Sequence, residues 1–89
     1  MNMKVKEGFI LRAMGENHLV VPVGALTVDF RCIITLNDTG AFLWQQLQQE
    51  RSEAELVQQL LDEYDVTAER ATADVTAFVE QLKKADLLV

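Results

Sequence analysis

Cys32 and His18 are the natural candidates for a nucleophile and its base, because the chain has one cysteine and one histidine. A reactive cysteine requires a thiolate, which forms in electropositive, partly exposed surroundings. Cys32 instead lies in an apolar, β-branched stretch, where a small buried side chain is the better interpretation. His18 lies beside a turn and is expected at an exposed strand end. One cysteine and one histidine do not complete a tetrahedral metal site. We therefore expect no catalytic residue, no metal and no cofactor.

The acidic residues offer no stronger catalytic pattern. Asp62, Glu63 and Asp65 form a cluster at the predicted end of a helix, where carboxylates are usually solvated. No oxygen-rich loop of calcium-binding spacing surrounds them. The sequence also has neither a glycine-rich phosphate loop nor a G-x-S-x-G turn. The chain is predicted not to be an enzyme.

The remaining chemistry is that of the backbone along residues 30–36. This stretch, FRCIITL, contains no proline and one charge, Arg31, although prolines and charges usually protect the edge of a sheet. An edge strand of this kind can pair with an added peptide through its free N–H and C=O groups. The alternative is a central strand with both sides paired, and the pattern favours neither arrangement.

Three strands are predicted to build the element that carries this backbone. FILRAM (9–14) and HLVVPV (18–23) flank the turn residues 15–17 as a hairpin, with Pro22 at an edge, a bulge or a strand end. The third strand is expected within 27–36, ordered from about residue 30. Its side chains alternate between two faces. One face carries Phe30, Cys32, Ile34 and Leu36, and the other Arg31, Ile33 and Thr35.

The segment LNDTGAFLW (36–44) joins the third strand to a helix expected from about 38 to 49. Asn37 can cap this helix, because its side-chain oxygen accepts from N–H groups that the first turn leaves unpaired. Leu36, just before the cap, is placed to pack onto Ala41 as a hydrophobic staple.

Two further helices are predicted. The second begins with a capping box of Ser52 and Glu55 and carries an apolar stripe to Tyr64. The third follows the cap Thr67 and ends near Lys84, and residues 87–89 are expected to fold back onto the core. Its apolar stripe consists of Ala71, Val75, Phe78, Val79 and Leu82. The predicted order is βββααα in one α+β domain over residues 1–89.

Charge and composition restrict the partners. The net charge of −6 lies entirely in residues 45–89, which hold four basic and ten acidic side chains. Such a surface repels phosphate backbones and favours basic peptides or proteins as partners. The sequence has no signal peptide and no apolar run that could span a membrane. Together with the single cysteine, this predicts a cytoplasmic protein.

Four segments of the chain are distinctive in combination: VPVG (21–24), LNDTGAFLW (36–44), SEAELVQQLLDEYDV (52–66) and ADVTAFVEQLKKADLL (73–88). Together they resemble the PqqD family, small proteins and domains also called RiPP recognition elements, after ribosomally made, post-translationally modified peptides. The resemblance covers roughly residues 9–88. Two positions depart from the family pattern. Asp86 stands where the family usually has glycine, and residues 29–31 replace an F-N-G type turn.

The resemblance implies a winged helix-turn-helix-like domain that binds the leader segment of a ribosomally made precursor peptide. The leader adds as a strand beside the third strand and packs against the third helix. The domain then presents the peptide to a modifying enzyme, often a radical SAM protein that itself carries the iron–sulfur cluster. The implied peptide-binding residues are Phe30, Arg31, Cys32, Ile33, Ile34, Thr35 and Leu36 on the strand, and Val75, Phe78, Val79 and Leu82 on the helix.

Two other functions fit a domain of this size. A winged-helix regulator would bind nucleic acid, but the predicted helix over 53–66 has five acidic residues and no basic one. A self-associating module would use the free strand edge to pair with a second copy as a homodimer.

Overall fold

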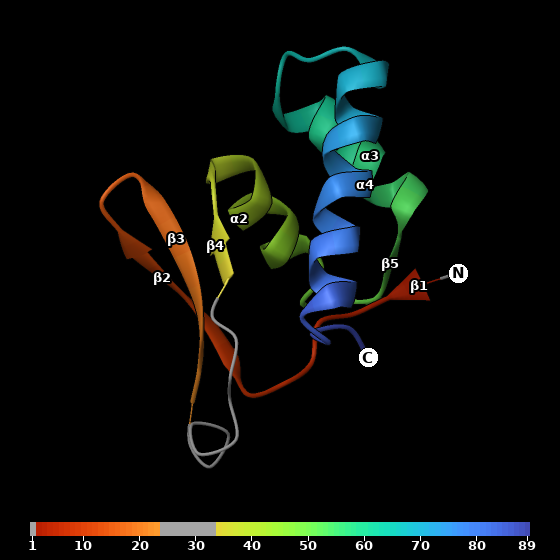
Figure 1. Cartoon of the computed structure of the whole chain (residues 1–89). Helices are drawn as coiled ribbons and strands as arrows, with labels where there is room; N and C mark the ends of the chain where they lie inside the picture. Colours follow the sequence, from red (N-terminus) through yellow and green to blue (C-terminus); the bar gives the residue numbers. More distant parts are fainter. Residues whose placement is uncertain (1, 24–33) are drawn as a thin grey trace.

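Five strands and three helices make up the fold of the computed structural model, which describes residues 2–23 and 34–89 (Figure 1). The fold is α+β, with a three-stranded antiparallel sheet followed by three helices, as predicted. A short two-stranded ribbon was not predicted. The elements are β1 (Asn2–Met3), β2 (Phe9–Met14), β3 (Asn17–Pro22), β4 (Ile34–Leu36), α2 (Asp38–Gln46), β5 (Arg51–Ser52), α3 (Glu53–Glu63) and α4 (Ala68–Lys84).

The main sheet has the order β2-β3-β4. A two-residue turn joins β2 to β3, and its first residue, Gly15, has a φ of +62°, a value that glycine adopts without strain. The predicted hairpin is confirmed, with β3 beginning at Asn17 and ending at Pro22. The predicted third strand is described only as β4. Its remaining residues, 27–33, lie outside the described part of the chain.

The cap of α2 is confirmed, but the helix is shorter than predicted. The side-chain oxygen of Asn37 accepts from the Gly40 backbone N–H at 2.8 Å. The helix ends at Gln46 and not near residue 49. Beyond it the N–H groups of Gln48 and Gln49 donate to carbonyls only three residues back, at 3.2 and 3.4 Å. This tighter turn leads directly into β5, which is why the polar tract does not extend the helix.

The caps of α3 and α4 are as predicted. In the capping box of α3, the Glu55 N–H donates to Ser52 Oγ at 3.2 Å and the Ser52 N–H donates to Glu55 Oε1 at 3.0 Å. The Thr67 side chain accepts from the Arg70 N–H at 3.1 Å at the start of α4. Local side-chain chemistry therefore sets where both helices begin.

The end of α4 uses a left-handed residue. Asp86 has a φ of +57°, and its N–H donates to the Lys83 carbonyl, while the Leu87 N–H donates to Leu82 at 2.9 Å. These two bonds form a Schellman motif, which ends the helix and turns the chain back. Leu87 is buried as expected, but Val89 is exposed, so the prediction that the whole tail packs onto the core is wrong for its last residue.

The short ribbon ties the beginning of the chain to the rest of the fold. β1 pairs antiparallel with β5, Asn2 opposite Ser52 and Met3 opposite Arg51. Val5 then forms a bridge with Leu88, and its N–H donates to the Leu47 carbonyl at 3.0 Å. Strands of two residues have no periodicity, so nothing in the sequence pattern indicates them.

The core lies where α2 separates the sheet from the α3–α4 pair (Figure 1). The sheet contributes Val20 and Leu36, and Trp44 of α2 is 2% exposed at the centre. Burial of these large apolar side chains is the main stabilising contribution of the fold. No helix in the described part of the chain is both long and apolar enough to cross a membrane.

Candidate functional site

One edge of the main sheet, along β4, has backbone groups that point away from the sheet. Met14 and Asn17 flank the two-residue turn and therefore form a hydrogen-bonded pair. Such pairs alternate along a strand, so β3 uses His18 and Val20 to bond β4, opposite Leu36 and Ile34. The N–H and C=O of the residue between them point outward. That residue is Thr35.

Among the described residues, β4 pairs with β3 and with no other strand. The sequence left open whether this strand is central or at an edge. Within the described residues it is an edge strand, with an exposed residue, Thr35, between its half-buried and buried neighbours. An edge of this kind can hydrogen-bond an added strand.

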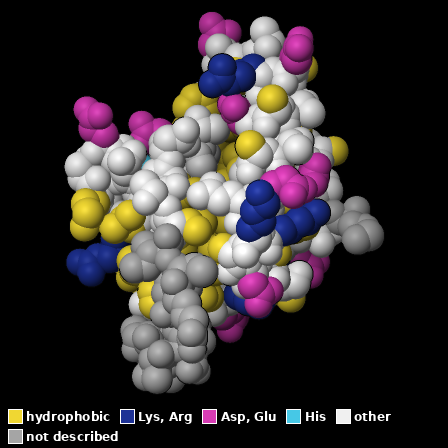
Figure 2. Space-filling view, viewed as in Figure 1, with side chains coloured by type: hydrophobic (Ala, Val, Ile, Leu, Met, Phe, Trp, Pro, Cys, Tyr) yellow, Lys and Arg dark blue, Asp and Glu magenta, His cyan; other side chains and the backbone are white. Residues whose placement is uncertain are grey.

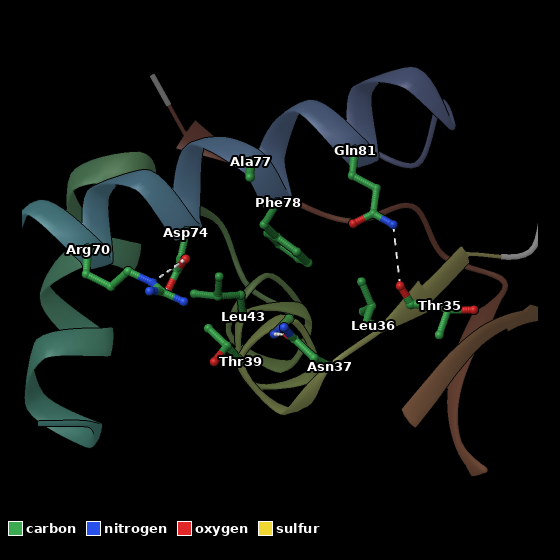
Figure 3. A pocket seen from close by; sticks show the side chains of 11 residues that line it. Thr35, Leu36, Asn37, Thr39, Leu43, Arg70, Asp74, Ala77, Phe78 and Gln81 are labelled. Atoms are coloured by element: carbon green, nitrogen blue, oxygen red, sulfur yellow. Dashed lines mark hydrogen bonds and ion pairs between the residues drawn. The ribbon is translucent and has the colours of Figure 1, made fainter. Parts of the chain in front are cut away.

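A groove of about 220 Å³ runs beside this edge. One wall is β4, the floor is the first half of α2, and the other wall is one face of α4 (Figure 3). Phe78 points from α4 into the space between the walls (Figure 3). The lining residues are Thr35 and Leu36 of β4, Asn37, Thr39, Gly40 and Leu43 around the start of α2, and Arg70, Asp74, Ala77, Phe78 and Gln81 of α4.

One side chain crosses the groove. The Gln81 Nε2 of α4 donates a hydrogen bond to the Thr35 carbonyl at 3.4 Å (Figure 3). This contact is independent evidence that the Thr35 carbonyl faces α4 and not β3. It also joins the two walls at this end of the groove.

An ion pair lies at the other end. Arg70 Nε donates to both carboxylate oxygens of Asp74, at 3.1 and 3.2 Å. The two residues are one helical turn apart on α4 and point toward the groove (Figure 3). The groove therefore has an apolar middle between a polar end and a charged but balanced end.

Only part of the predicted strand segment can be placed. Phe30, Arg31, Cys32 and Ile33 lie outside the described residues. Of the other three, Leu36 is buried and lines the groove, Thr35 is exposed at the edge, and Ile34 is half-buried.

The predicted helix residues lie mainly in the core. Val75 and Val79 are each 1% exposed and Leu82 is fully buried, and only Phe78 of the predicted four lines the groove. The other groove residues of α4 were missed: Arg70, Asp74, Ala77 and Gln81. They recur every three or four residues, as a stripe beside the apolar one. That spacing indicates one face of the helix, but only the position of α4 beside β4 shows that this face lines a groove.

His18 has a structural role beside the groove. Its Nε2 lies 2.9 Å from Asp38 Oδ1, in the first turn of α2, so the pair links β3 to the start of that helix. The side chain is 26% exposed, which is less than the expected exposed strand end. The contact helps to position α2 against the sheet.

The chain is similar to one known protein family and to solved structures of other proteins. A family model described as coenzyme PQQ synthesis protein D (PqqD) matches residues 25–88. A solved structure titled "TbiB1 in Complex with the TbiA(beta) Leader Peptide" aligns with a TM-score of 0.72 and 18% identity, over 96% of this chain and 93% of that one. Another, "Lasso peptide synthetase B1 complexed with the leader peptide", aligns at 0.71 and 24%, over 100% and 99%. These likenesses show a shared fold. No curated protein sequence matches the chain.

Proposed function

The chain belongs to the PqqD family, and we propose that it is an adaptor that captures the leader segment of a ribosomally made precursor peptide and presents it to a modifying enzyme. The observation that carries the proposal is the outward-facing backbone of Thr35 beside a groove of about 220 Å³. The two structural neighbours, which are complexes with leader peptides, support it.

Binding would occur by strand addition. The leader extends beside β4 as a fourth strand, and its backbone exchanges hydrogen bonds with the N–H and C=O of Thr35. The sequence predicts that the leader also pairs with residues 30–33, which lie outside the described part of the chain. Main-chain pairing of this kind gives affinity with modest demands on the leader sequence.

Sequence selectivity would come from the helix side of the groove. Alternate side chains of an added strand point to opposite faces, so those on one face meet α4. There they find the apolar surface of Phe78 and Ala77, flanked by the Arg70–Asp74 pair. An apolar leader residue fits the middle of the groove, and a polar residue fits its charged end.

This adaptor needs no catalytic group. Holding the leader keeps the segment to be modified at a high effective concentration near the enzyme that acts on it. We propose a radical SAM enzyme as that partner, because the family resemblance implies enzymes of this type. The adaptor contributes binding and delivery.

Charge would speed the encounter with a basic leader. The helical half carries ten acidic and four basic side chains. On the face in Figure 2, Asp and Glu lie over the helices together with Lys and Arg, and other acidic side chains lie over the side of the sheet. Such a surface accelerates the association of a basic peptide, and the effect weakens as salt rises. A salt-dependent association rate with a nearly constant dissociation rate is the expected signature.

The decisive experiment compares proline substitutions at the two sheet edges. Thr35→Pro removes an N–H that points away from β3, so the sheet loses no hydrogen bond while the added strand does. Ala13→Pro is the matched control, because Ala13 alternates with the hydrogen-bonded residues of β2 and its N–H faces the opposite edge. The probe is the synthetic leader of a short precursor peptide sought among the genes that neighbour the gene of this chain, and the TbiA(beta) leader serves as a non-cognate peptide.

We expect the wild type and Ala13→Pro to bind the leader and Thr35→Pro to lose about tenfold or more in affinity. In NMR titration, the amide of Thr35 should become protected from exchange while that of Ala13 does not change. Binding that survives in Thr35→Pro, with the same Kd as in Ala13→Pro, would contradict strand addition at β4. Light scattering of the free protein tests the competing use of the edge, since pairing with a second copy predicts a mass that rises with concentration.

A further inference from the structure

We propose that Gln81 is a gate on the free edge of β4: it occupies the Thr35 carbonyl in the free protein and releases it when a peptide strand is added. The inference rests on the proposed function and deepens it, because it names a residue that controls access to the same site. The hydrogen bond between Gln81 Nε2 and the Thr35 carbonyl is its starting point.

The hydrogen bond between Gln81 and Thr35 is easily broken. At 3.4 Å it is longer than the 2.7–3.2 Å of ordinary N–H···O bonds, so it is weak. Gln81 is exposed, and water can therefore satisfy its amide once the bond is broken. A leader N–H that donates to the same carbonyl would replace one hydrogen bond with another in better geometry.

The carbonyl that Gln81 occupies is the last one available along this edge. The carbonyls of Ile34 and Leu36 face β3. The next outward position is Asn37, whose carbonyl already accepts from the Ala41 N–H at 2.9 Å, inside α2. An added strand that passes Thr35 therefore meets a carbonyl that already accepts a hydrogen bond inside α2, and Gln81 controls access to the last carbonyl that is bonded neither in the sheet nor in that helix. The gate would thus fix where pairing with the leader ends.

The position of Gln81 on α4 also restricts the groove. It follows Phe78 by three residues and lies on the same side of the helix, and both line the groove. In the free protein its side chain spans the space between α4 and β4 at this end (Figure 3). A leader side chain that enters here must displace the amide. A strand that pairs with Thr35 compensates for the lost Gln81–Thr35 hydrogen bond. A misaligned peptide does not, so the gate selects against it.

The experiment compares Gln81→Ala with Gln58→Ala, both at exposed glutamines within helices. Gln58 donates to Asp62 on α3 and lines no described part of the groove, so it controls for loss of a surface amide. Gln81→Glu keeps the side-chain length but replaces the donor amide by a carboxylate oxygen, which cannot hold the Thr35 carbonyl. Affinity for the same synthetic leader is measured by titration calorimetry at high salt, where the added charge is screened.

We expect Gln81→Ala and Gln81→Glu to bind the leader about twofold more tightly than the wild type, the low end of the range for one hydrogen bond that no longer competes, because the bond is long and exposed. Gln58→Ala should bind like the wild type. In NMR spectra of the wild type, the side-chain amide of Gln81 should shift on leader binding. Equal or weaker binding by both Gln81 variants would overturn the gate while leaving the adaptor function in place. If neither the wild type nor any variant binds, the proposed function fails and the gate with it.

Discussion

Gly40, in the first turn of α2, lies directly against Leu36, the last residue of β4. A Cβ at position 40 would come within 3.1 Å of Leu36 Cβ and 3.2 Å of its Cδ2. Leu36 is buried and its Cβ moves only with the strand. The absence of a side chain at this position therefore allows β4 and α2 to meet closely enough to form the wall and the floor of one groove.

Gly40→Ala is expected to destabilise the protein although alanine favours helices. Alanine gains about 1 kcal/mol over glycine inside a helix, whereas overpacking costs about 1–3 kcal/mol. We expect a net loss of about 1 kcal/mol in the free energy of unfolding, measured with urea. Thr76→Ala, at an exposed position of α4, is the control and should change stability by less than about 0.5 kcal/mol. Unchanged or greater stability of Gly40→Ala would mean that β4 can shift freely.

Ala77→Trp should block the groove without unfolding the protein. Ala77 is exposed and lines the groove from α4, so an indole there fills much of its volume of about 220 Å³. We expect leader affinity to fall at least about tenfold, measured by titration calorimetry. Thr76→Trp places the same side chain on the neighbouring exposed position, outside the groove lining, and should bind normally. Equal binding by the two variants would show that the leader does not occupy this groove.

Replacing Asp86 by glycine should preserve the stability of the protein, whereas replacing it by valine should lower that stability. Its left-handed φ of +57° is costly for most residues, more so for a β-branched one. Asp86→Gly removes this cost together with a solvent-exposed ion pair to Lys6, so we expect a gain of about 0.5 kcal/mol. Asp86→Val should lose about 1–2 kcal/mol. Thermal unfolding at high salt, which screens the ion pair, separates the two contributions. Similar stability of both variants would contradict the Schellman ending of α4.

Stability should depend on the charge of Glu55. The backbone N–H of Ser52 lowers the pKa of this carboxyl, with smaller contributions from the Ser52 hydroxyl and Arg51 against an opposing effect of burial. A lowered folded pKa contributes stability above the ordinary value of about 4.3, and this contribution disappears as the pH falls through the folded pKa. Glu55→Gln should therefore be less stable than the wild type at pH 7 and equal to it in acid.

Urea unfolding from pH 3 to 7 measures this difference. Glu53→Gln removes a charge from the same first turn without touching the capping box and should lose less stability at pH 7. A constant difference between wild type and Glu55→Gln across the range would contradict the role of the carboxylate in the cap.

Local patterns predicted the parts of the fold that depend on neighbours in sequence. The caps at Asn37, Ser52 and Thr67 follow from side chains that bond N–H groups three residues later. The left-handed turn at Asp86 is likewise local, because its two hydrogen bonds join residues three and five positions apart. The ribbon of β1 and β5 depends on distant residues instead, and two-residue strands carry no period to detect.

In the candidate site, too, the sequence predicted what depends on neighbouring residues and missed what depends on the tertiary fold. The period of α4 correctly identified its apolar face, but Val79 and its apolar neighbours on that face are committed to the core. Gln81 and Asp74 belong to the adjoining polar stripe, which in sequence resembles any solvated helix surface. They line a groove only because α4 packs beside β4, and that relationship is set by the tertiary fold.

The β1–β5 ribbon has a consequence for the order of folding. The ribbon joins Met3 to Arg51, and the isolated bridge next to it joins Val5 to Leu88, so together they close very long loops. The entropy of closing such loops is compensated only after the helices have formed the surface on which Val5 is buried. We expect the ribbon to form last and to open first. In native-state hydrogen exchange, the amide of Val5 should therefore lose protection before those of Val20 and Leu36.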